Sequence, residues 1–239
     1  MTVSLIILII VVAFFAQSIF GFGGGLISIP LLSLLVSVQE AVTLVLIFQV
    51  SMGVLIVKTY RDTSWKVVLP VTVGLLVGTF IGTFFLAAVS DAFLRRFLAV
   101  STLVFLVKMV FFPNLKFGKL QDTRQGLVSG VIGGFFQGMI GTGGPVFVMY
   151  LSAALSDVVA FRASLIYLLF VSNVVRLAIS IPTGLLKAEI FQVAGVGAPL
   201  FLMAIFLGQR IHHKIKEEYY RYCVYAILFF SALSLFLKA

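Results

Sequence analysis

Two glycine clusters, each preceded by a glutamine, are the residues of this chain best suited to bind a ligand. The first reads FGFGGGLISIPLL over residues 20–32, and the second reads IGTGGPVFVMYL over residues 140–151. Glycine disfavours helix, so each cluster predicts an interrupted helix. The second half of such a helix begins with free backbone N–H groups and a partial positive charge. Because glycine also lets a ligand approach the backbone closely, the pattern predicts two anion cradles without formal charge.

Gln17 and Gln137 precede these clusters by about one helical turn. Their amide groups could donate to a bound oxyanion, or they could pair with backbone groups loosened at the break, and the two interpretations are compatible. Pro145 follows the second cluster, and it suits the first turn of a helix because its missing N–H costs nothing there.

Further polar residues interrupt the second and sixth apolar stretches, at Gln49, Ser51, Ser172 and Asn173. Arg176 lies one turn beyond Asn173, so the two share a helix face. A charge inside a membrane span is a functional candidate, although a long side chain can also snorkel to the interface. The candidate substrate-binding residues are therefore Gln17, Gly21, Gly23, Gly24, Gly25, Ser51, Gln137, Gly141, Thr142, Gly143, Gly144, Ser172, Asn173 and Arg176.

The composition determines the kind of protein that must position these residues. The 239-residue chain is 62% hydrophobic and 10% charged, whereas soluble domains carry about 25% charged residues. A chain of this length cannot bury so much apolar surface in one water-soluble core. The composition excludes a soluble enzyme, a nucleic-acid-binding module and a disordered chain. It predicts an all-α polytopic membrane protein, in which the net charge of +9 reflects topology.

Polar loops separate eight apolar stretches, at about 3–38, 41–57, 67–89, 91–112, 125–155, 159–181, 190–207 and 222–237. A single helix over 3–37 would be about 52 Å long, but the hydrocarbon core is only about 30 Å thick. The first and fifth stretches contain the glycine clusters. Each of them either crosses the membrane or forms a re-entrant hairpin of two half-helices.

An internal repeat divides the chain. At an offset of 120, FAQSIFGFGG (15–24) lies over FFQGMIGTGG (135–144) with five identical residues in ten. The sequence thus predicts an N-terminal membrane repeat over 1–112, a linker loop over 113–124 and a C-terminal membrane repeat over 125–239. Each repeat holds four apolar stretches and begins with a broken helix.

The basic residues distinguish the two topologies. Of fifteen Lys and Arg outside the stretches, the crossing scheme places eight on one side and seven on the other. The re-entrant scheme places eleven on one side and four on the other, which the positive-inside rule favours. It implies three crossings per half, inverted repeats and termini on the non-cytoplasmic side.

Other patterns have simpler explanations. Glycines recur every four residues at 74–82 and at 126–138, which predicts faces for tight helix packing, and the stripe at 74–82 could also serve a homodimer contact. Carboxylates avoid the middle of every stretch, so a proton would have to travel with the substrate, or Na⁺ would have to bind backbone carbonyls. His212, His213 and the single Cys223 are poorly placed for a metal site, and no ATP-binding motif is present. We expect no cofactor.

The two glycine motifs, repeated within two four-segment units of a chain of this length, resemble the TauE/SafE family, whose members are also grouped as toluenesulfonate-uptake-type permeases. The resemblance covers the whole chain, although Met149 and Tyr150 stand where analogy with Pro30 would place a proline. It implies a cell-membrane secondary transporter, often an exporter, for sulfite, sulfonates, sulfoacetate or related sulfur-containing anions. The residues support the same chemistry, because backbone N–H groups and amides suit an oxyanion.

Three alternatives remain open at the level of the sequence. An anion channel would need a continuous polar pathway, and the spans hold few polar residues. A transporter of a different small organic or inorganic anion would use the same cradles. A membrane-embedded enzyme would need a buried nucleophile with a base, or a metal cluster, and the histidines and cysteine lie in the wrong places for either.

Overall fold

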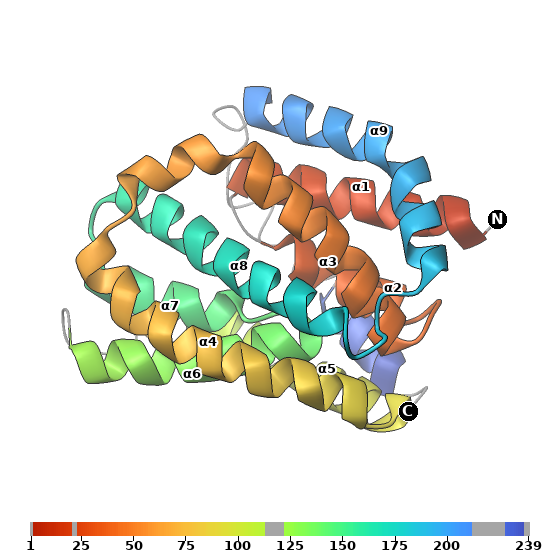
Figure 1. The fold of residues 1–239 in the computed structure, drawn as a ribbon, viewed down its shortest axis with the longest axis horizontal. Coiled ribbons are helices and arrows are strands. Elements are labelled where there is room, and N and C mark those ends of the chain that lie inside the picture. Colours follow the sequence, from red (N-terminus) through yellow and green to blue (C-terminus); the bar gives the residue numbers. More distant parts are fainter. Residues whose placement is uncertain (1, 21–22, 113–121, 212–227, 237–239) are drawn as a thin grey trace. The chain divides into compact units, whose positions relative to one another are not determined.

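The structure is a computed structural model that describes residues 2–20, 23–112, 122–211 and 228–236 (Figure 1). The expectations for Gly21, His212, His213 and Cys223 and for most of the predicted linker fall outside these ranges. The helices are α1 (Thr2–Phe20), α2 (Gly24–Leu32), α3 (Val38–Leu55), the 3-10 helix η1 (Val57–Asp62), α4 (Trp65–Ala88), α5 (Asp91–Phe111), α6 (Thr123–Ile140), α7 (Gly144–Ala154), α8 (Val158–Ser180) and α9 (Ala188–Ile211). Residues 228–236 are also helical, and no strand occurs in the described ranges, which confirms the all-α prediction.

Both glycine clusters interrupt a helix, as predicted. The first apolar stretch is divided into α1 and α2, and the fifth into α6 and α7. Among the described residues, four helices are long and apolar enough to cross a membrane, namely α3, α4, α8 and α9. The protein is therefore an integral membrane protein.

The chain forms two compact units. The first unit contains Met1–Phe48, Val89–Pro113 and Leu186–Ala239, and the second contains Gln49–Ala88 and Asn114–Leu185. Each unit therefore draws helices from both predicted repeats. This division describes packing, whereas the predicted halves describe a repeat in the sequence, so the boundaries of the halves stay a prediction.

Helices α4 and α6 lie side by side in the second unit and meet through their glycines (Figure 1). A Cβ at Gly78 would overlap the carbonyl of Val131, and one at Gly130 would overlap the carbonyl of Val71. Only helices without side chains at these points can approach so closely. The two glycine stripes are therefore packing faces within the second unit.

The opposite side of α4 carries large apolar side chains. The exposed residues of this helix include Leu69, Val73, Leu76, Val77, Phe80, Ile81, Phe84 and Phe85. Water would disfavour such a surface, whereas lipid tails accept it without cost. Small residues inside and large apolar residues outside are what a membrane-spanning helix requires.

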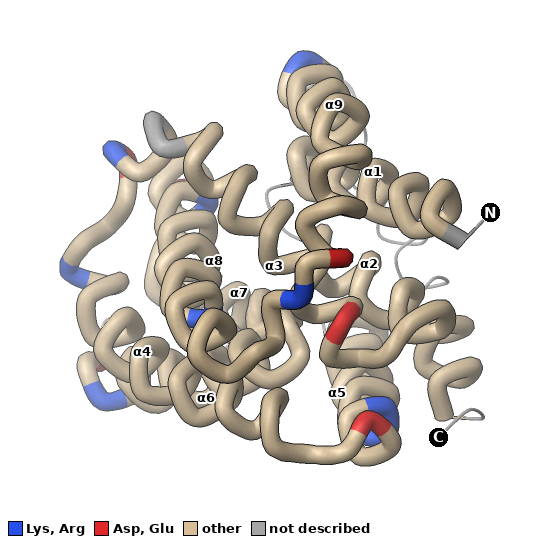
Figure 2. Tube along the Cα trace, turned by 45° about the vertical axis from the view of Figure 1, so that its right-hand side comes forward, with Lys and Arg blue, Asp and Glu red and all other residues tan. Residues whose placement is uncertain are grey.

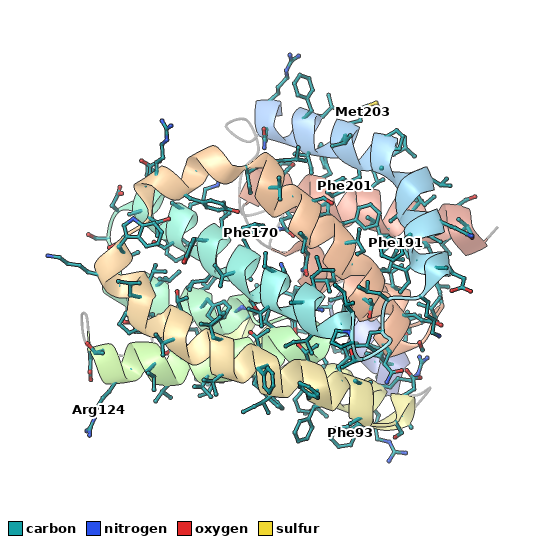
Figure 3. All side chains as sticks on the ribbon, in the orientation of Figure 1. Phe93, Arg124, Phe170, Phe191, Phe201 and Met203 are labelled. Carbon is teal, nitrogen blue, oxygen red and sulfur yellow. The ribbon has the colours of Figure 1, made fainter. Side chains whose placement is uncertain are left out.

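Helices α1 and α9 pair in the first unit. The ring of Phe201 on α9 packs against Phe14 and Phe48, with ring centroids 5.2 and 4.9 Å away. Met203 on the same helix points away from this cluster and is exposed (Figure 3). A Cβ at Gly208 would lie against Ser18 of α1, so this pair also depends on a glycine at its contact.

An ionic clamp connects the start of α5 to the turn between α2 and α3 in the first unit. Asp91 accepts a hydrogen bond from the backbone N–H of Val38 at 2.7 Å, and it also pairs with Arg95 at 2.6 Å. Arg95 donates to the carbonyls of Ser33 and Val36, where α2 ends. These charged side chains satisfy backbone groups that the turn leaves without a helical partner.

We predict that Gly78→Ala lowers the thermal stability of the purified protein. The added methyl must displace backbone of α6, and overpacking of this kind costs about 1–3 kcal/mol. Gly195→Ala on α9 is the matched control, because a Cβ there meets no heavy atom within 4 Å. Thermal unfolding in detergent measures both. An unchanged melting temperature in Gly78→Ala would contradict the close helix contact.

We also predict that Asp91→Ala destabilises the fold. The change leaves the Val38 N–H and the Arg95 guanidinium without their shared acceptor, at a cost of about 1–3 kcal/mol. Asp62→Ala, at the exposed end of η1, removes the same charge and should change stability by less than about 0.5 kcal/mol. Equal melting temperatures for the two variants would show that the clamp contributes nothing.

Candidate functional site

The break between α6 and α7 turns the chain back on itself. Gly141 ends α6 in the left-handed conformation, with φ of 68°, and its N–H bonds to the carbonyl of Gln137. Helix α7 then packs along α6, where Gly133 makes room for the ring of Phe147 and Gly126 for the hydroxyl of Tyr150. The two helices form a hairpin, which is the local geometry that the re-entrant scheme requires. Its orientation in the membrane stays a prediction.

A hydrogen-bond network starts at this break. The N–H of Gly143 donates to Oε1 of Gln137 at 2.8 Å, and Nε2 of Gln137 donates to Oδ1 of Asn173 at 3.0 Å. Gln137 is 1% exposed and Asn173 is 3% exposed, so these bonds lie away from solvent. Of the two interpretations of Gln137, the structure contains the one in which the amide pairs with backbone at the break.

Arg176 continues the network along α8. Its Nη1 donates to Oδ1 of Asn173 at 3.0 Å and to Oε1 of Gln49 at 3.2 Å. The side chain is 1% exposed. The snorkelling interpretation is therefore wrong, because the guanidinium lies inside the protein beside two amide oxygens. A positive charge held in a buried polar network near a broken helix is suited to binding an anion.

The two glycines that start α7 differ in their surroundings. A Cβ at Gly143 would overlap the carbonyl of Gly133 and lie 2.7 Å from Cβ of Gln137. A Cβ at Gly144 would meet no heavy atom within 4 Å. Gly143 is thus required for packing, whereas Gly144 borders open space at the helix N-terminus. Thr142, between the two helices, is 3% exposed.

The two predicted serines have different environments. Ser172 is fully buried and shares a 2.8 Å hydrogen bond with Thr79 of α4, which lies at the contact between α4 and α8. Ser51 is exposed on α3. The structure therefore brings Gln137, Asn173 and Arg176 together in one network, and Ser172 is adjacent to Asn173 in the chain.

The break in the first unit has a related local arrangement. Gly23 caps α2 in the left-handed conformation, with φ of 106°, and its carbonyl accepts the N–H of Ile27 at 2.9 Å. A Cβ at Gly24 would overlap Oε1 of Gln17, so this glutamine also lies against the glycines of its break. Gly24 and Gly25 are buried. Within each unit, the glutamine contacts the start of the second half-helix, as its position one turn earlier suggests.

A separate cavity of about 410 Å³ lies in the first unit. Its lining consists of Ile6, Val36, Glu40, Leu44, Lys187, Glu189, Ile190 and Val193, none of which the sequence analysis selected. Lys187 donates to Glu40 at 3.0 Å, and this bond raises the pKa of the lysine. Two carboxylates at one lysine make the cavity unsuited to anions.

The charged residues of the described helices lie mostly at helix ends (Figure 2). Within the described ranges, no three His, Cys, Asp or Glu side chains come together as a metal site. The buried Arg176 is an exception to the pattern of terminal charges, and this is why its surroundings matter for function.

The sequence analysis noticed Gln49 but did not include it among the binding residues. It lies 127 residues from Arg176 in the chain, and the two meet only because α3 and α8 are brought together. In the sequence, Gln49 is noticeable only as a polar residue inside an apolar stretch. That feature does not identify its hydrogen-bond partner. Thr79 was missed altogether, because a threonine in a glycine-rich helix is ordinary in membrane proteins.

Broken helices, a buried polar network beside one break and apolar exposed faces define the class of protein. They are characteristic of helical membrane transporters, in which discontinuous helices line a substrate site. Sequence comparison supports this class: the pattern of the family described as "Sulfite exporter TauE/SafE" matches residues 6–235. The chain belongs to the TauE/SafE sulfite exporter family. This confirms the resemblance that the two glycine motifs suggested.

A similar protein is the "Probable sulfite/organosulfonate exporter TauE" of Cupriavidus necator. The two are 24% identical over 181 residues, which cover 75% of this chain and 71% of the relative. No solved structure matches the chain. The name of the family describes a transporter and not an enzyme, in agreement with the function expected from the sequence.

We predict that Gln137→Met destabilises the protein. Methionine has a similar volume but leaves the buried N–H of Gly143 without its acceptor, which costs about 1–3 kcal/mol. Gln192→Met on the exposed part of α9 makes the same substitution without loss of a buried bond. Thermal unfolding of the two variants checks the prediction, which fails if Gln137→Met melts no earlier than the control.

Proposed function

We propose that this protein is a secondary transporter that moves small sulfur-containing oxyanions, such as sulfite, sulfonates or sulfoacetate-like anions, by alternating access. The observation that carries the proposal is the buried guanidinium of Arg176, connected through Asn173 and Gln137 to the broken helix at Gly143. Membership of the TauE/SafE family supports the substrate class. The named relative, a probable sulfite/organosulfonate exporter, supports the same class and the direction of export.

The proposed site holds the anion near the middle of the membrane. The proposal retains both cradles expected from the sequence, the N-termini of α2 and α7, as the source of partial positive charge for the anion. The guanidinium and the amides of the network orient its oxygens. This assignment makes all fourteen sequence-predicted residues candidates, and it gives priority to Gly144, Asn173 and Arg176, because Gly144 borders open space and the other two belong to the buried network.

The proposed topology is re-entrant. The α6–α7 hairpin supports this scheme, as does the distribution of Lys and Arg between the two sides. Both termini would then face the non-cytoplasmic side of the cell membrane, and the two halves would be inverted repeats. A proton or Na⁺ is proposed as the coupling ion, and the proposed homodimer would use a surface other than the glycine stripes, because these pack α4 against α6.

We predict that methanesulfonate and sulfite stabilise the purified wild-type protein saturably against heat. A ligand that binds only the folded protein must raise its apparent stability by mass action. Chloride, which has a different shape from these sulfur oxyanions, is tested for comparison. No stabilisation by either sulfur oxyanion would contradict the proposed substrate class.

Gly144→Leu should retain the fold but lose this stabilisation. Its Cβ meets no heavy atom within 4 Å, so the side chain enters the open space that the anion is proposed to use. Gly195→Leu on α9, where the Cβ is equally unobstructed, is the matched control and should respond to ligand as the wild type does. Full stabilisation of folded Gly144→Leu would place the anion elsewhere. In proteoliposomes, flux that never saturates with substrate concentration would indicate a channel.

A further inference from the structure

The cavity in the first unit combines an apolar interior with a charged mouth. Ile6, Leu44 and Ile190 line it and are all buried. The charged residues Lys187 and Glu189 also line it, and both are exposed. Its volume of about 410 Å³ falls within the range of about 300–1,000 Å³ that is usual for ligand sites. A ligand that matches this cavity therefore has an apolar body and a polar end.

The cavity lies at one end of the helices that form it. Glu40 and Glu189 belong to the first turns of α3 and α9, which are both long and apolar enough to cross a membrane. Leu44 and Val193, which also line the cavity, follow these glutamates by one helical turn. The cavity thus extends from the helix ends toward the apolar middle of the spans. Its mouth is at the level where lipid headgroups meet the hydrocarbon core.

The mouth carries charged groups of both signs. Lys187 donates to Glu40 at 3.0 Å, across 147 residues of the chain. Glu40 raises the pKa of Lys187 most, through this hydrogen bond, and the charge of Glu189 raises it further. A lysine ammonium has three N–H donors, so Lys187 can bond to Glu40 and to an anionic oxygen at the same time. Each carboxylate accepts several hydrogen bonds. The mouth therefore offers partners for both charges of a zwitterion.

We propose that this cavity binds one membrane lipid whose headgroup is a zwitterion with a primary ammonium, as in phosphatidylethanolamine. The phosphate accepts a hydrogen bond from Lys187, and the ammonium donates to Glu189 and Glu40. One acyl chain lies along the apolar interior, beside Leu44 and Val193. This site is separate from the proposed anion site, and the inference does not depend on the proposed transport.

The headgroup decides which lipid the cavity prefers. Lipid tails are as apolar as the cavity wall, so an acyl chain contributes fit and little selectivity. The quaternary ammonium of phosphatidylcholine has no N–H to donate to the carboxylates. The headgroup of phosphatidylglycerol bears only negative charge, so it can use Lys187 but offers no cation to Glu40 and Glu189. A primary ammonium beside a phosphate matches all three side chains.

The test measures thermal unfolding of the purified full-length protein in detergent, with added lipids that share the same acyl chains. The probes are dioleoyl phosphatidylethanolamine, dioleoyl phosphatidylcholine and dioleoyl phosphatidylglycerol. A ligand that binds only the folded protein raises its apparent stability by mass action. We expect phosphatidylethanolamine to reach half of its effect at about one tenth of the mole fraction that the other two require. It alone can donate charged hydrogen bonds to the carboxylates.

Two variants test the two parts of the site. Val193→Trp fills the cavity and should lose the preference for phosphatidylethanolamine, whereas Val196→Trp, at an exposed position of the same helix, should keep it. Glu189→Gln removes one carboxylate of the mouth and should narrow the preference over phosphatidylcholine. Asp62→Asn makes the same kind of charge change at an exposed position that does not line the cavity, and it should behave as the wild type. Because Glu189 is exposed, its variant tests the proposal even where Val193→Trp does not fold.

The contrary outcomes are specific. Half-saturation at the same mole fraction for all three lipids would overturn the proposal, because the lipids would then act only as a solvent. A preference that persists unchanged in folded Val193→Trp would overturn the assignment to this cavity. Soluble phosphoethanolamine separates a lipid from a free zwitterion: equal stabilisation at the same total concentration would show that no acyl chain is needed, and it would overturn the lipid assignment. The proposed transport has its own test, which uses sulfur oxyanions and Gly144→Leu.

Discussion

The structure depends on one constraint: away from water, every backbone N–H and C=O must find a partner within the protein. A continuous helix meets this requirement by itself, but a broken one does not. At the break between α6 and α7, Gln137 accepts the N–H of Gly143, and Gly141 bonds back to the carbonyl of Gln137. One glutamine thus makes a discontinuity acceptable in an apolar environment. The same side chain connects the break to Asn173 and Arg176. The residue that satisfies the backbone at the break is therefore also part of the candidate binding site.

The glycine contact between α4 and α6 supports this arrangement. Hydrophobic attraction gives little reason for two helices to associate in lipid, so contact depends on close van der Waals packing. Glycines at Gly74, Gly78 and Gly82 on α4 and at Gly130, Gly134 and Gly138 on α6 bring the two backbones together. Because α6 carries Gln137, its firm attachment to α4 also holds the network in place. Thr79 extends the same support to α8 through its bond with Ser172.

Arg176 illustrates how burial changes the meaning of a residue. In the sequence it stands a few residues before the end of a span, where a long basic side chain commonly reaches for the interface. In the structure its guanidinium lies against Asn173 and Gln49 and is almost completely buried. The protein therefore bears the cost of placing a charge away from water. Such a cost is accepted where the charge serves a ligand or a mechanism.

The sequence by itself determined that the chain lies in a membrane, that it is helical and where its helices break. These depend on local quantities: apolar length against the thickness of a bilayer, and the poor helix propensity of clustered glycine. The motif around those breaks was specific enough to indicate the family. Only the tertiary structure decided which polar residues meet, because Gln49 and Arg176 are separated by 127 residues and no local pattern relates them. It also decided that Ser51 is exposed while Ser172 is buried, and that Gly143 is packed while Gly144 borders open space. Each of these differences depends on the neighbouring helices. The sequence of a single segment does not show which helices will pack against it.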